Sequence, residues 1–136
     1  MDFLKSIAIA ASGLRAQAGR MRIIAENLAN ADSTATQPGA DPYRRRIVTF
    51  RSEIDKALDA QVVALGRVRP DQTEFRVKYE PGHPSADANG YVKYPNVNSL
   101  IEMTDMREAQ RSYEANLNVI GASRRMIQRT LDILKS

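Results

Sequence analysis

Both ends of this 136-residue chain carry apolar residues spaced alternately by three and four positions. That spacing is typical of a helix that buries one narrow stripe against another helix. At the N-terminal end it predicts a single helix from about Phe3 to Leu28. The stripe, which we call the N-terminal seam, consists of Leu4, Ile7, Ala11, Leu14, Ala18, Met21, Ala25 and Leu28. Its alanines would let a partner backbone approach closely.

A similar stripe predicts a C-terminal helix from Ser99 to about Leu134. This C-terminal seam consists of Met103, Met106, Gln110, Tyr113, Leu117, Ile120, Arg124, Ile127, Leu131 and Leu134. Two of its positions, Gln110 and Arg124, are polar, and polar seam residues specify register at a cost in stability. Ser99 and Glu102 have the spacing of a capping box, in which a hydroxyl and a carboxylate satisfy free amides at the start of a helix.

The length of the C-terminal helix limits the possible architectures. At 1.5 Å per residue it would measure about 54 Å, whereas a compact globule of this size would be only about 37 Å across. Such a helix cannot be contained in a compact globule. We therefore expect the two terminal helices to pair as a coiled-coil-like hairpin that is completed by neighbouring subunits. A free-standing two-helix hairpin is the alternative.

The middle of the chain has the composition of turns and short strands. Residues 30–41 are rich in Ala, Thr, Ser, Asp, Gly and Pro and should be extended or irregular. Short strands are predicted at 43–51, 61–68, 74–79 and 91–94, and a short helix at 53–58. Turn signals lie at 81–84 and 89–90.

These patterns predict a mainly α fold with a small β insert. We divide the chain into an N-terminal assembly helix (1–30), an extended linker and strand (31–52), a small β-rich insert (53–98) and a C-terminal assembly helix (99–136).

Residues that could carry catalysis or bind a metal are scarce. The chain has no cysteine, which excludes disulfides and thiolate ligands. Its one histidine, His83, lies between Gly82 and Pro84 and is expected to be a turn residue rather than a general base. Residues 85–90 resemble the start of a calcium loop, but Asn96 stands where a bidentate Glu is required. A turn held by Asp87 and Asn89 is the better interpretation, and we expect no catalytic residue, metal or cofactor.

The distribution of charge argues against nucleic-acid binding. Twenty basic and 16 acidic side chains leave a net charge of +4, spread along the whole chain. Only Arg44, Arg45 and Arg46, with Arg51 nearby, approach the concentrated basic face that binding to phosphates requires. We expect a solvated or partner-facing strand there. No apolar run approaches the roughly 20 residues of a membrane helix. Asp2, in what should be a positive leader, argues against a cleavable signal peptide.

Two segments carry a family resemblance that extends over nearly the whole chain. Residues 26–33, Glu-Asn-Leu-Ala-Asn-Ala-Asp-Ser, resemble the N-terminal signature of bacterial flagellar basal-body rod and hook proteins. Residues 79–98 are similar to the proximal rod proteins lettered C in the flagellar series, and residues 42–46, 108–109 and 112–116 agree. Residues 34–38 lack the Thr-Gly-Tyr continuation that is frequent in the wider family. The motif residues are Asn27, Asn30, Pro81, Gly82, His83, Pro84, Gly90, Tyr91, Tyr94, Pro95 and Asn96.

The resemblance implies a structural protein rather than an enzyme. Such proteins pass through the flagellar type III export apparatus without a cleaved signal and polymerise into the periplasmic rod that transmits torque. Their terminal helices line the axial tube, and a small β-rich segment faces outward. The implied partners are copies of this chain, other rod and basal-body proteins and the export apparatus, with no nucleic acid and no direct membrane insertion. A non-polymerising hairpin adaptor that binds a partner helix is the alternative, but it gives residues 81–98 no role.

Overall fold

The computed structural model describes residues 2–136. Along the sequence, one long helix precedes six short strands and a second long helix follows them. Helix α1 spans Phe3–Ala29 and helix α2 spans Ser99–Lys135, so both predicted helices are confirmed. The strands are β1 (Arg46–Ile47), β2 (Phe50–Asp55), β3 (Ala60–Leu65), β4 (Arg69–Pro70), β5 (Arg76–Tyr79) and β6 (Tyr91–Tyr94). The two helices pack together beside a small β-rich middle segment, as predicted. No helix in residues 2–136 is long and apolar enough to span a membrane.

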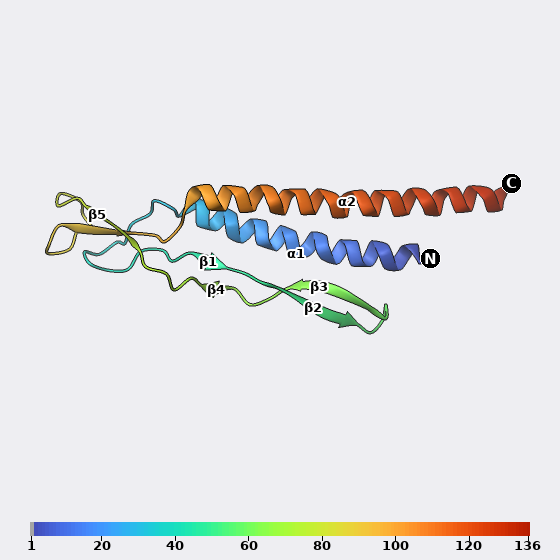
Figure 1. Ribbon diagram of the computed structural model, residues 1–136, viewed down its shortest axis with the longest axis horizontal. Helices are drawn as coiled ribbons and strands as arrows, with labels where there is room; N and C mark the ends of the chain where they lie inside the picture. The colour runs from blue at the N-terminus through green and yellow to red at the C-terminus, as the bar shows by residue number, and fades with distance from the viewer. Residues whose placement is uncertain (1) are drawn as a thin grey trace. The chain divides into compact units, whose positions relative to one another are not determined.

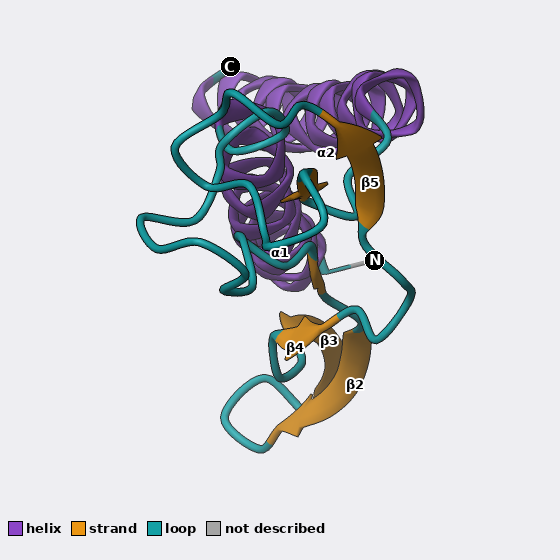
Figure 2. Cartoon of the chain, turned by 90° about the vertical axis from the view of Figure 1, so that its left-hand side faces the viewer, coloured by secondary structure: helices purple, strands orange, loops and turns teal. Residues whose placement is uncertain are grey.

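The strands form three separate antiparallel pairs rather than one sheet (Figure 2). Strand β1 pairs with β4, β2 with β3, and β5 with β6. The predicted strands at 61–68, 74–79 and 91–94 correspond to β3, β5 and β6. The β1–β4 pair is only two residues long on each side, which is too short to leave a periodic pattern in the sequence.

The short helix predicted at 53–58 is wrong. Residues up to Asp55 belong to β2, which pairs with β3 from Phe50 opposite Leu65 to Asp55 opposite Ala60. The Asp55 carboxylate then accepts the amide of Ala57 at 2.9 Å and begins a turn. Aspartate side chains that bond to nearby backbone amides favour turns over helix. Asp59 completes the reversal with a left-handed backbone, at a φ of 48°.

The capping box predicted for α2 is also wrong, because the cap is one residue earlier. The side-chain oxygen of Asn98 accepts the amides of Leu100 at 3.1 Å and Ile101 at 3.4 Å. Asparagine is a strong N-cap residue for this reason. The Glu102 carboxylate is buried and bonds to side chains far away in the sequence.

The chain divides into two compact units, and both helices contribute residues to each. Unit 1 contains Met1–Met21, Thr49–Arg67 and Arg107–Ser136. Unit 2 contains Arg22–Val48 and Val68–Met106.

In unit 1, the N-terminal part of α1 lies between α2 and the β2–β3 hairpin (Figure 1). Two glycines let neighbouring elements approach α1 closely, one on each side of the helix. A Cβ atom on Gly13 would lie 2.7 Å from Nδ2 of Asn116, and one on Gly19 would lie 2.6 Å from Cδ1 of Leu65. The Ser12 hydroxyl also accepts the amide of Val63 at 3.2 Å, which ties the hairpin to α1.

Unit 2 combines an apolar core with buried polar groups. The buried apolar side chains include Ile23, Ile24, Val92, Tyr94 and Val97. Val92 and Tyr94 alternate with exposed Tyr91 and half-buried Lys93 along β6, so one face of the β5–β6 pair is covered. Among the largest fully buried side chains are also Asn27 and Glu102. Buried polar groups of this kind need bonding partners.

Candidate functional site

The N-terminal seam keeps part of its surface accessible. None of its eight residues is fully buried, and Leu4, Ala18 and Ala25 are exposed. Seven positions of α1 are buried. Four of them lie one residue before a seam residue, namely Ala10, Gly13, Ile24 and Asn27, and the other three are Ser12, Ala16 and Ile23. One residue is about 100° of rotation around a helix. The intrachain contact is therefore centred to one side of the seam.

The C-terminal seam shows the same offset. Glu102, Ala109 and Ser123 are buried, and each lies one residue before a seam position. Six seam residues are exposed, namely Met103, Gln110, Leu117, Arg124, Leu131 and Leu134. The other four, Met106, Tyr113, Ile120 and Ile127, are half-buried. Neither seam is therefore fully buried within the chain.

A polar cluster in unit 2 is built around Asn27, which is 1% exposed. Its Nδ2 donates to the carbonyl oxygen of Arg46 at 2.9 Å and to Oε2 of Glu102 at 3.3 Å. Its Oδ1 accepts the hydroxyl of Tyr43 at 2.7 Å and the amide of Arg46 at 2.9 Å. These four bonds satisfy both donors and the acceptor of the amide. Burial raises the pKa of Tyr43, so its hydroxyl remains a donor at neutral pH.

The charge of the cluster comes from Arg45. Its guanidinium donates to the buried carboxylate of Glu102, lies 3.1 Å from Oδ2 of Asp71 and lies 3.8 Å from Oδ2 of Asp105. Burial lowers the pKa of Arg45, but the bonds to Glu102 and Asp71 outweigh burial and raise it. The amide of Thr73, together with Arg45, lowers the pKa of Asp71. Every charge in the cluster therefore has a partner, as buried charges require.

Asn96 connects this cluster to the segment between β4 and β5. Its Oδ1 accepts the backbone amide of Arg45 at 2.8 Å. Its Nδ2 donates to the carbonyl oxygens of Asp71 at 3.0 Å and Thr73 at 3.1 Å. Two of the motif residues, Asn27 and Asn96, thus hold the same short segment around Arg45 from two sides.

Three other motif residues make separate bonds in unit 2. Asn30 donates to the carbonyl oxygen of Glu26 at 2.8 Å at the end of α1. The Tyr94 hydroxyl donates to the Glu80 carboxylate at 3.1 Å, and burial, together with that carboxylate, raises the pKa of Tyr94. Pro95 is fully buried, and its carbonyl oxygen accepts Nε of Arg76 at 3.1 Å.

The remaining motif residues lie in the turns between β5 and β6, apart from Tyr91, which is the first residue of β6. Nδ1 of His83 accepts the amide of Ser85 at 3.0 Å, which confirms the predicted turn role. The Asp87 carboxylate accepts the amides of Asn89 and Tyr91, both at 2.9 Å, so its predicted part in the second turn is confirmed. Gly90 has a φ of 87°, and the Tyr79 and Tyr91 rings meet edge to face with centroids 5.2 Å apart. Pro81, Gly82 and Pro84 are exposed.

The sequence patterns missed Arg45, Asp71 and Glu102. Arg45 stands in a run of three arginines that is typical of a solvated strand. Glu102 stands in a local capping pattern, although it lies one heptad before Ala109 on the buried line of α2. That periodic position is the signal that could have identified Glu102 as a buried side chain.

Two family models and several known proteins match this chain. Residues 7–35 match the family described as flagella basal body rod protein, and residues 88–133 match the family described as flagellar basal body rod FlgEFG protein C-terminal. The chain is 54% identical over 128 residues to the flagellar basal-body rod protein FlgC of Agrobacterium fabrum, covering 94% of this chain and 92% of that protein. This chain belongs to the FlgC family of flagellar basal-body rod proteins.

More distant FlgC proteins also align over their whole length. The FlgC of Salmonella typhimurium is 41% identical over 98% of both chains. That of Bacillus subtilis is 36% identical over 99% of this chain and 100% of its own length. The family consists of structural rod proteins, so this member is a structural subunit of the flagellar basal-body rod and not an enzyme.

Proposed function

We propose that this chain polymerises through its terminal helices into the proximal rod of the bacterial flagellum, where it transmits torque and forms part of the wall of the export channel. The observation that carries this proposal is the accessibility of both seams. Each helix buries positions beside its seam, so the exposed seam residues remain available for neighbouring subunits.

The end of α2 shows how much surface a neighbour could cover. Residues 128–135 are exposed without exception. Leu131, Ile133 and Leu134 are 46%, 73% and 76% exposed. Burying apolar surface stabilises by about 25 cal/mol per Å². Contacts of adjacent subunits with these two turns would therefore contribute strongly to assembly.

A polar atom in unit 1 supports the same proposal. Oε1 of Gln17 is buried and has no bonding partner within residues 2–136. Gln17 lines a cavity of about 480 Å³ between α1 and β2–β3, which Asn116 of α2 also borders. Unpaired buried acceptors are costly. A donor from a neighbouring subunit would remove that cost.

The proposed place of work is the periplasmic rod, reached through the flagellar type III export apparatus without a cleaved signal. The proposed partners are further copies of this chain, other rod and basal-body proteins and the export apparatus. The polar cluster of unit 2 fits a subunit that transmits torque, because its fully bonded side chains resist rearrangement.

An aspartate in the C-terminal seam tests the proposal. Leu117→Asp would place an unpaired carboxylate in the subunit interface. Burying a charge without a partner costs on the order of several kcal/mol. We expect motility and incorporation into rods to be lost in cells that lack the native protein. Asn118→Asp adds the same charge one position away from the seam and should leave both intact. Normal incorporation of Leu117→Asp would refute the seam assignment.

Helix content tests the coupling of folding to assembly. Because the seams lack partners in a lone subunit, the dilute protein should show less helix than the 27 and 37 residues of α1 and α2. A fully helical monomer that melts cooperatively would contradict this coupling.

Co-sedimentation of the protein with isolated basal bodies separates the two candidate functions. A rod subunit should sediment as a polymer, whereas a hairpin adaptor should sediment as a single bound copy.

A further inference from the structure

The short β1–β4 pair borders a groove whose lining is basic. The groove has a volume of about 620 Å³. Its lining residues all belong to unit 2 and are Tyr43, Arg44, Arg46, Val68, Arg69 and Pro70. Three of the six lining residues are arginines, and none is acidic. The polar cluster does not explain these three arginines, because the guanidinium in that cluster belongs to Arg45.

Arg44 is held in place by neutral groups. Nη1 of Arg44 donates to the carbonyl oxygens of Asp71 at 2.9 Å and Thr73 at 3.0 Å. Its guanidinium also lies over the ring of Phe75, 4.1 Å from the centroid. Within residues 2–136, Arg44 forms no ion pair. Its position is therefore fixed while its charge is not neutralised.

The other two arginines are more accessible. Arg46 forms one ion pair, with Glu26 at 3.1 Å, and its side chain is 51% exposed. Arg69 is exposed and forms no ion pair with any residue in the described part of the chain. A single exposed ion pair contributes little binding free energy. A planar guanidinium, however, can bind a carboxylate through two parallel hydrogen bonds.

The positive charge is a local property of the groove. Unit 2 as a whole has eight basic and nine acidic side chains. Its acidic groups are largely engaged elsewhere. Three of them surround Arg45, and three others bond to Tyr94, Lys93 and Arg76. Near the groove, Glu26 is the one carboxylate that pairs with a lining arginine.

We propose that this groove docks an extended acidic segment of another protein, with carboxylates alternating with small apolar side chains. In an extended segment, alternate side chains point the same way about 7 Å apart. One set could reach Arg44, Arg46 and Arg69 while the other packs on Val68 and Pro70. Nucleic acid fits less well, because the one aromatic lining residue, Tyr43, is half-buried and its hydroxyl is engaged by Asn27.

This inference extends the proposed function, because a rod subunit has to recognise neighbours of a different kind. Its test does not depend on polymerisation. The probe is a fluorescein-labelled peptide of alternating Glu and Val, compared by anisotropy with a Gln and Val peptide and with an oligothymidylate of equal charge. We expect the acidic peptide alone to bind tightly, with an affinity that falls as salt is added.

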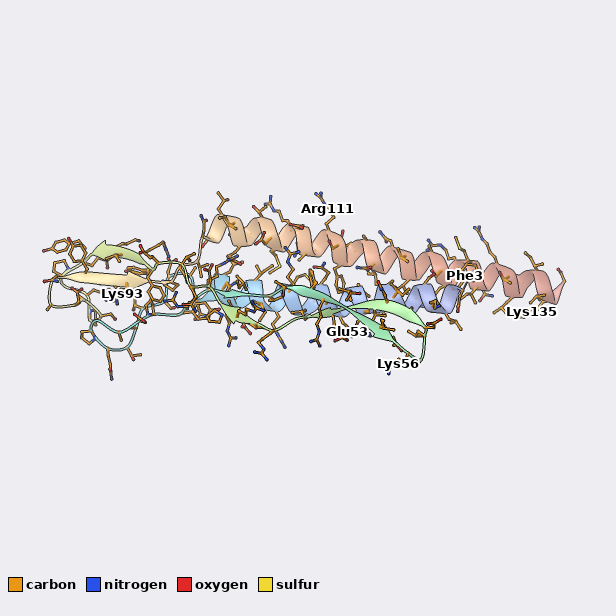
Figure 3. The ribbon with its side chains drawn as sticks, turned by 60° about the horizontal axis from the view of Figure 1, so that its bottom comes forward. Phe3, Glu53, Lys56, Lys93, Arg111 and Lys135 are labelled. Carbon is orange, nitrogen blue, oxygen red and sulfur yellow. The ribbon has the colours of Figure 1, made fainter. Side chains whose placement is uncertain are left out.

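Two charge-removing variants sharpen the test. Arg69→Gln removes a side chain that makes no bond within residues 2–136 and should weaken peptide binding about tenfold, or about 1.4 kcal/mol. Arg111→Gln removes an exposed cation on the side of α2 away from α1 (Figure 3) and should leave binding unchanged. Equal losses in both variants, no binding of the acidic peptide, or tighter binding of the oligonucleotide would each overturn the inference. Failure of the unaltered chain to enter rods, with intact peptide binding, would count against the proposed function alone.

Discussion

Asn27 and Glu102 lie 75 positions apart in the sequence, yet the amide nitrogen of one donates to the carboxylate of the other at 3.3 Å. Both side chains are 1% exposed. The bond joins the last turns of α1 to the first turn of α2 inside unit 2. Arg45 neutralises the carboxylate. The contact therefore holds both helices and the segment that leads into β1 in one arrangement.

The first prediction concerns the charge of Glu102. Glu102→Gln keeps the shape of the side chain but leaves Arg45 without its buried partner. Removing one member of a buried ion pair costs about 3 to 5 kcal/mol. We expect about 3 kcal/mol less free energy of unfolding, because Arg45 keeps Asp71 and is partly exposed.

Urea unfolding followed by tyrosine fluorescence measures this loss, since four of the five tyrosines lie in unit 2 and the chain has no tryptophan. Glu114→Gln, at an exposed position of α2, is the control and should change little. Equal stability of the two variants would show that the cluster does not hold unit 2 together.

The second prediction concerns the stability of the folded chain at acidic pH. The amide of Thr73 and the guanidinium of Arg45 lower the pKa of Asp71 below its usual 3.8. The unfolded chain therefore binds this proton more readily than the folded chain. The stabilisation is complete above about pH 4 and is lost as the pH falls through the lowered value. Asp71→Asn should flatten the acid side of a plot of urea midpoint against pH, whereas Asp59→Asn, at an exposed turn, should not. An unchanged acid side in Asp71→Asn would contradict this role.

The two long helices and the strands β3, β5 and β6 were predictable from the sequence, but the two-residue strands β1 and β4 and the turn at Asp55 were not. The seams of α1 and α2 repeat over several turns, so both helices could be placed nearly to the residue. The helix predicted at 53–58 was wrong because the turn at Asp55 and the pairing with β3 decide the structure there. Glu102 was misassigned because a capping carboxylate and a buried ion-pair carboxylate are the same residue type. Only the fold places Arg45 beside it.

The third prediction concerns the turn before β6. Gly90 has a φ of 87°, and a Cβ atom there would lie 2.8 Å from Cε2 of Tyr79. Gly90→Ala therefore combines left-handed strain with a steric clash, and we expect a loss of about 1 to 3 kcal/mol. Gly82→Ala is the matched control, because nothing lies within 4 Å of its added Cβ. Thermal unfolding followed by near-ultraviolet circular dichroism compares the two. A smaller effect at Gly90 than at Gly82 would exclude the strained turn.

The last prediction concerns the close approach of α1 and α2 in unit 1. Gly13→Ala should gain about 1 kcal/mol of intrinsic helix stability. The added Cβ would, however, lie 2.7 Å from the side chain of Asn116, which is short and bonded to the carbonyl oxygen of Ser112. Overpacking of this kind costs about 1 to 3 kcal/mol. The single variant should therefore be less stable than the parent.

Truncating the opposing side chain should reverse this effect. With Asn116→Ala in the background, Gly13→Ala meets no clash and keeps the helix gain, so the double variant should be about 1 to 2 kcal/mol more stable than the sum of the single effects. Thermal melts at a protein concentration where the helix signal has saturated provide the four stabilities of this cycle. Gly121→Ala, whose nearest neighbour is the flexible end of Arg125 at 3.4 Å, should show no such coupling to Asn116. Additive effects at Gly13 and Asn116 would mean that the two helices do not meet at these residues in solution.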